Sequence, residues 1–98
     1  MLKPSFVMKI LWNGTIIAES KDVLVEGSDY YFPYDSVDTE MLQKSKAIFH
    51  CTDKGYADQY DLWVRGCVLA NAAWIYPHPY PLAARLKGRV GFKKHLVQ

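Results

Sequence analysis

The sequence predicts a mainly β domain of six to eight short antiparallel strands with two small helices. Two observations predict it: residue pairs that favour tight turns separate strand-like runs, and these runs are short along the whole chain. Half of the 98 residues are hydrophobic, which is enough to close one core. We therefore treat residues 1–98 as a single domain.

The run VMKILWNGTIIAES is the clearest hairpin, because its Asn-Gly pair readily adopts the positive φ angles of a two-residue type I′ turn. Regular pairing would place Ile10 opposite Ile17 and Leu11 opposite Ile16. Apolar side chains would then lie on both faces of the strands, as in a barrel or a sandwich.

The segments DVLVEG and YYFP are the next predicted strands, and the proline of YYFP ends the second of them or confines it to an edge. The segment SVDTEMLQKS is expected to hold one helical turn. Asp38 or Thr39 would cap that turn, and Met41 and Leu42 would pack inward.

The segment KAIFHC is strand-like and breaks at TDKG. The runs YADQYDLWV and CVLANAAWIY then form a second predicted hairpin across an Arg-Gly turn. Its register would oppose Val64 to Cys67 and Leu62 to Leu69, so Cys67 is predicted to lie in the core.

The segment PHPYP cannot be regular structure, and Pro81 is expected to start a short helix that Gly88 stops. The run RVGFKKHLV is the final predicted strand. We interpret its basic residues as the protection of a solvated edge strand, which Lys93 and Lys94 would blunt unless it pairs in a dimer.

Composition argues against two classes of partner. The net charge of +2 is too small to indicate nucleic-acid binding, and no apolar run approaches the roughly 20 residues that span a bilayer. The opening residues MLKPSF lack the apolar run of a secretory leader, and two cysteines stand 16 positions apart. We therefore expect a soluble, reduced, cytoplasmic protein.

The segments NGTIIAES, YYFP, HCTDKGYA, AAWIYPHPYP and GRVGF occur in an order and spacing that resemble the family catalogued as domain of unknown function 427, which carries a nucleotidyltransferase-like label. The resemblance runs from about residue 10 to residue 92, and Thr52 stands where the family usually has proline. It implies two packed antiparallel sheets of the β-tent type, similar to methionine sulfoxide reductase B and to the thalidomide-binding domain of cereblon. Those relatives commonly hold zinc between two C-x-x-C pairs, and this chain has no such pair.

Cys51 and Lys54 are the candidate catalytic residues. An ammonium folded back over the sulfur would favour the nucleophilic thiolate. His50 is a poor base for this thiol, since adjacent strand residues point to opposite faces, so a base would come from His78 or Asp58. The alternative is that Cys51 is a small buried hydrophobe and Lys54 a turn residue.

Aromatic side chains from several segments suggest a small-ligand pocket between the HCTDKG turn and the AWIYPHP segment. Its walls would include Tyr31, Phe32, Trp63, Trp74 and Tyr76, with Lys54, Asp58 and Glu19 at the rim. The predicted ligand-binding residues are Lys54, Gly55, Trp74, Tyr76, Tyr31, Asp58 and His50. Ordinary core packing of the aromatic residues is the alternative interpretation.

The ligand would be a small, anionic organic or nucleotide-like molecule, with its charge on Lys54 and its flat face on Trp74. A non-catalytic module that binds another protein is the competing function. Nucleotidyl transfer would need carboxylates that hold magnesium, and no convincing set or phosphate-binding loop is present. We therefore expect neither a metal nor a cofactor.

Overall fold

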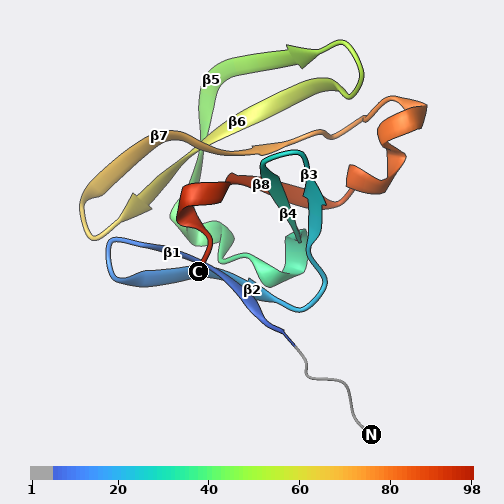
Figure 1. Ribbon diagram of the computed structural model, residues 1–98. Coiled ribbons are helices and arrows are strands. Elements are labelled where there is room, and N and C mark those ends of the chain that lie inside the picture. Colours follow the sequence, from blue (N-terminus) through green and yellow to red (C-terminus); the bar gives the residue numbers. More distant parts are fainter. Residues whose placement is uncertain (1–5) are drawn as a thin grey trace, which may run out of the picture.

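The computed structural model describes residues 6–98, and it is mainly β, as predicted (Figure 1). A two-stranded sheet, β1-β2, packs against a six-stranded antiparallel sheet with the order β3-β4-β8-β7-β6-β5. The strands are β1 (Met8–Trp12), β2 (Thr15–Ser20), β3 (Leu24–Glu26), β4 (Asp29–Pro33), β5 (Leu42–Cys51), β6 (Gly55–Val64), β7 (Cys67–Ile75) and β8 (Arg89–Lys93).

The helices in the described residues are short 3-10 turns: η1 (Tyr34–Ser36), η2 (Thr39–Met41), η3 (Pro81–Leu86) and η4 (Lys94–Leu96). The helical turn predicted near Asp38 is η2, and the Asp38 side chain caps it by accepting from the Glu40 amide. Pro81 begins η3, as predicted. Helices are few and short, as predicted, and the turns η1 and η4 are additional to the two that the sequence indicated. No helix in this part of the chain could cross a membrane.

The first hairpin forms at the predicted turn, where Asn13 has a φ of 49° and Gly14 a φ of 73°. Leu11 pairs with Ile16, as predicted. Ile10 pairs with Ala18, so its predicted pairing with Ile17 was wrong. A β-bulge beside Ile10 shifts the register by one residue.

The second hairpin turns at Arg65 and Gly66, and it pairs Val64 with Cys67 and Leu62 with Leu69, as predicted. Cys67 is exposed, however, so its predicted place in the core was wrong. The first hairpin reaches this turn on the Val64 side, where Asn13 Nδ2 donates to the Val64 carbonyl oxygen over 3.0 Å. The first hairpin thus contacts the turn at Val64, which is buried, whereas Cys67 stays exposed.

The C-terminal strand is not an edge strand, which corrects that prediction. Strand β8 lies between β4 and β7, and it ends at Lys93, where η4 begins. Val90, Gly91 and Phe92 are all buried, so both faces of this strand are covered. The strand order places β3 and β5 at the edges of the large sheet.

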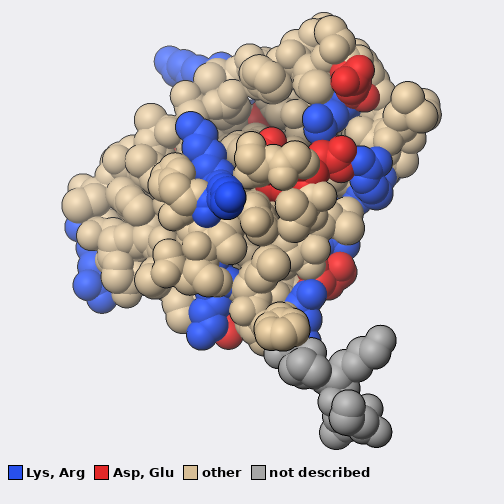
Figure 2. Space-filling model, viewed as in Figure 1, with Lys and Arg blue, Asp and Glu red and all other residues tan. Residues whose placement is uncertain are grey.

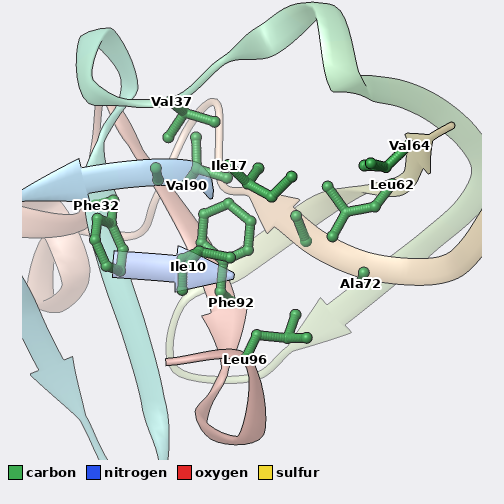
Figure 3. Packing of buried hydrophobic residues seen from close by; sticks show 12 residues of the cluster. Ile10, Ile17, Phe32, Val37, Leu62, Val64, Ala72, Val90, Phe92 and Leu96 are labelled. Atoms are coloured by element: carbon green, nitrogen blue, oxygen red, sulfur yellow. The ribbon is translucent and has the colours of Figure 1, made fainter. Parts of the chain in front are cut away.

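The larger core cluster fills the space between the two sheets (Figure 3). Ile10 and Ile17 of the first hairpin meet Phe32, Leu62 and Phe92 of the large sheet there. Both sides of the hairpin are also tied by backbone bonds, since the Gln98 amide donates to Lys9 and the Asp38 amide donates to Ile17. The hairpin is thereby fixed over one face of the large sheet.

A smaller cluster lies on the opposite face of the large sheet, and it consists of Tyr31, Ala57, Tyr76, Ala83 and Leu86 with Leu24, Cys51 and Trp74 against it. Helix η3 covers part of this face through Ala83 and Leu86, and Arg85 of η3 pairs with Glu26 of β3. The face carries tyrosines and a tryptophan beside small residues, so it is where a hollow can form.

Replacement of Phe92 by alanine tests the packing between the sheets. Phe92 is fully buried and meets Phe32 edge to face, with ring centroids 5.8 Å apart. We expect the free energy of unfolding, measured by urea denaturation, to fall by about 3–5 kcal/mol. Leu82→Ala is the control, since Leu82 is 88% exposed, and it should change stability by under about 0.5 kcal/mol. Equal effects of the two substitutions would contradict this account of the core.

Candidate functional site

A hollow of about 260 Å³ lies on the face of the large sheet that carries the smaller cluster. It is built by strands β4 to β8, and Figure 2 shows acidic and basic side chains close together on this side of the molecule, below the β5–β6 hairpin. The residues around it are Asp29, Phe49, Gln59, Asn71, Trp74, Tyr76 and Lys93. The lining is therefore three aromatic rings with four polar side chains.

The indole of Trp74 forms one fixed wall of the hollow. Its Nε1 donates to the Tyr31 hydroxyl over 3.0 Å, and the two rings meet edge to face at 84°. The indole also lies directly over Gly91, where a Cβ would come within 2.4 Å of Nε1. Because its N–H is already bonded, Trp74 offers a ligand mainly its ring face.

Tyr76 is a second wall, and burial raises its pKa well above the usual value for a phenol. The nearby Tyr31, Cys51 and Asp29 raise this pKa further when they carry negative charge. Burial raises the pKa of Tyr31 as well. Both phenols are therefore neutral at physiological pH, and both remain hydrogen-bond donors.

Asp29 places a carboxylate at the edge of the hollow. Burial raises its pKa, and the positive charges of Lys54 and, more weakly, Lys93 act in the opposite direction. Asp29 of β4 pairs directly with Lys93 of β8 in the sheet register. Desolvation affects this pKa more than the two lysines do, so the lysines offset only part of the cost of burying the negative charge.

Lys54 and Cys51 lie together beside this face, in the turn between β5 and β6. Lys54 Nζ donates to Cys51 Sγ at 4.0 Å, and half-buried Cys51 packs against the smaller cluster. Neither residue lines the hollow, but the positive charge of Lys54 acts to lower the pKa of Asp29 at its edge.

The proline-rich segment docks onto the same turn. The Tyr80 amide donates to the Lys54 carbonyl oxygen over 2.9 Å. Gly55 has a φ of 105°, and a Cβ there would lie 3.3 Å from the Tyr80 ring. The HCTDKG and YPHPY segments are thus in contact, and Gly55 supplies both the turn and the room for Tyr80.

Several predicted site residues lie away from the hollow. Asp58 forms an ion pair with Lys44 at 3.8 Å. Because neighbouring strand residues face opposite sides, Asp58 points away from the hollow, which Gln59 lines. His50 stacks on Tyr56 with ring centroids 4.4 Å apart and lies 3.3 Å from the Tyr80 hydroxyl. Three more predicted residues also lie elsewhere: Phe32 is in the larger core cluster, Trp63 is on the exposed surface, and Glu19 pairs with Lys9 in the small sheet.

Five lining residues escaped the sequence reasoning: Asp29, Phe49, Gln59, Asn71 and Lys93. Alternation carried a signal for two of them, because Phe49 precedes Cys51 by two positions and Gln59 follows Ala57 by two. Asp29 and Lys93 required knowledge that β4 pairs with β8. That pairing joins distant segments and leaves no local mark in the sequence.

Asn71 reaches the hollow through an irregularity in β7. The pairing register between β6 and β7 shifts there, and Asn71 takes a φ of 51°. The backbone N–H of Asn71 donates to Asp61 Oδ1 over 2.8 Å. Within residues 6–98, Oδ1 of Asn71 is buried without a hydrogen-bond partner. Bulges commonly re-aim a side chain next to a functional site, and this one brings an amide to the hollow.

Residues 2–98 match the family described as domain of unknown function (DUF427), whose name is NTP_transf_9. No curated protein matches the chain significantly. In the described part of the chain no three His, Cys, Asp or Glu side chains come together in a group that could hold a metal ion.

The contact between Gly91 and Trp74 generates a first prediction for the site. The Cβ of Gly91→Ala would overlap the indole and the Tyr31 ring, so we expect stability to fall by about 1–3 kcal/mol and the indole N–H resonance of Trp74 to shift. In a Trp74→Ala background the same glycine substitution should cost less, because much of the overlap is gone. Additive costs in this double-mutant cycle would contradict the contact.

The raised pKa of Tyr76 generates a second prediction. The folded protein retains the phenol proton at a pH where the unfolded chain, with a pKa of about 10, has lost it. Stability is therefore complete below pH 10 and falls as the pH rises above it. In Tyr76→Phe this alkaline loss should be smaller, as measured by urea denaturation at several pH values. Tyr34→Phe, at an exposed position, is the control, and an identical pH dependence of both variants would contradict the prediction.

Proposed function

The chain belongs to the family described as domain of unknown function DUF427, and from that premise we propose that it binds a small organic molecule that carries a ring. The ring would sit in the hollow between Trp74, Tyr76 and Phe49. The observation that carries the proposal is the fixed indole of Trp74. The indole donates a hydrogen bond to Tyr31 and packs on Gly91. Its ring face is therefore held in place at the wall of the hollow before any ligand binds.

The lining supports this proposal by its composition. Ligand pockets combine apolar and aromatic walls with a few polar groups that orient the ligand. Gln59 and Asn71 supply amides, and Asp29 and Lys93 supply opposite charges. A hollow used only for core packing would have no reason to gather four polar side chains around aromatic rings.

The size of the hollow limits the ligand. Its volume of about 260 Å³ lies just below the roughly 300–1,000 Å³ of pockets for drug-sized molecules, so one or two rings would fill it. For a nucleotide-like ligand, only the base would enter. Any charged group would remain at the edge, where Lys54 and Lys93 supply positive charge.

We assign any reaction on the bound ligand to Cys51 as nucleophile, with Lys54 as the cation that supports its thiolate. The support for this assignment is the 4.0 Å contact between the two groups beside the hollow. Half-buried Cys51 packs against the smaller cluster, which includes Tyr76, so the sulfur lies near this wall of the hollow.

Binding of another protein is the second candidate function, and exposed apolar residues of the β5–β6 hairpin favour it. Ile48 is 65% exposed and Tyr56 is 60% exposed, and β5 is an edge of the sheet. Neither residue lines the hollow. The two functions can therefore be separated by substitutions at different places.

A screen of ring-bearing fragments by thermal shift, followed by measurement of Kd, tests the first function. Trp74→Ala should raise the Kd of a wild-type hit about fivefold or more, since stacking on an aromatic side chain contributes about 1–3 kcal/mol. Trp63→Ala is the matched control, because Trp63 is exposed and lies outside the hollow, and it should leave Kd unchanged. A well-folded wild-type protein without a single hit at millimolar concentration would contradict ligand binding and favour the interaction module.

A further inference from the structure

Asp29 and Lys93 form an unusual pair at the edge of the hollow. They stand directly opposite one another on β4 and β8, and both line the hollow and the open groove beside it. The ion pairs among residues 6–98 nevertheless join other residues: Lys9 with Glu19, Lys44 with Asp58, Arg85 with Glu26 and Arg89 with Asp22. Two opposite charges are thus held side by side without contact.

This arrangement discriminates between ligands by charge. A ligand with only a negative charge would meet Lys93 but also the carboxylate of Asp29. A ligand with only a positive charge would meet Asp29 but also the ammonium of Lys93. In a partly desolvated site such like-charge contacts are costly. A ligand that carries both charges at a short separation would satisfy both side chains at once.

We infer that the ligand class is a zwitterion of amino-acid size, with its ammonium on Asp29 and its carboxylate on Lys93. This inference rests on the proposed function, because the ring of the same ligand would occupy the hollow beside Trp74. Gln59 and Asn71 remain free to hydrogen-bond polar atoms of the ligand.

The surroundings support this orientation. Lys94 lines the groove together with Lys93, so a second positive side chain lies there and favours a carboxylate. The faces of Phe49, Trp74 and Tyr76 lie on the other side of the pair, where they attract an ammonium or its attached methylene groups as well as a ring. The volume of the hollow suits a single ring on a short chain.

Three probes of equal ring and chain length test the inference. L-phenylalanine carries both charges, phenethylamine lacks the carboxylate, and 3-phenylpropionate lacks the ammonium. We expect L-phenylalanine to bind at least tenfold more tightly than either analogue, because each charge-assisted hydrogen bond is worth about a tenfold or larger change in Kd. The Kd values come from titrations followed by NMR of the folded, full-length protein.

Substitutions assign the two charges to their partners. In Asp29→Asn the advantage of L-phenylalanine over 3-phenylpropionate should disappear, and in Lys93→Met its advantage over phenethylamine should disappear. Lys87→Met is the matched control, because Lys87 is an exposed lysine that lines neither the hollow nor the groove, so Kd should change by less than about threefold.

The possible failures are distinguishable. Equal binding of the three probes, or tighter binding of a singly charged one, would overturn the zwitterion inference and leave ring binding intact. Binding of uncharged ring fragments without binding of L-phenylalanine would also overturn it. Absence of binding by every ring-bearing probe would instead remove the proposed function itself.

Discussion

The missing side chain at Gly91 is the constraint on which the candidate site depends. The Trp74 indole lies where a Cβ of residue 91 would be, and from there its N–H reaches the Tyr31 hydroxyl. Strand β8 buries Val90 and Phe92 in the larger core cluster, while Gly91 faces the other side. One central strand therefore ties the core between the two sheets to the position of the indole.

This coupling explains how a chain of 98 residues can hold a polar hollow. The stabilising apolar contacts are concentrated between the small sheet and one face of the large sheet, where Phe32, Phe92 and Leu62 are fully buried. The opposite face of the large sheet carries only the smaller cluster and contributes fewer of these contacts. It can hold groups that are costly to bury, such as the carboxylate of Asp29 and the phenols of Tyr31 and Tyr76.

The fold was predictable where local chemistry decides it. Both hairpin turns and the register near them follow from Asn-Gly and Arg-Gly pairs and from apolar alternation.

The predicted pairing of Ile10 was wrong because of a β-bulge, since one extra residue in a strand shifts the pairing of all residues beyond it. The interior position of β8 also escaped, because its two lysines resemble edge protection and only the non-local pairing with β4 reveals the strand as central. Around the hollow, the spacing of Trp74 and Tyr76 predicted that these two residues share a face. The place of Asn71 depends on a bulge, and that of Asp29 and Lys93 depends on the pairing of β4 with β8.

The most direct test of the central claim is the map of amide and side-chain NMR shifts of the folded protein during titration with a ring-bearing ligand. If the hollow is the binding site, the largest shifts will be those of the Trp74 indole N–H and the side-chain amides of Gln59 and Asn71. Shifts confined to Ile48, Tyr56 and the β5 edge, or no saturable shift with any ligand, would contradict the account.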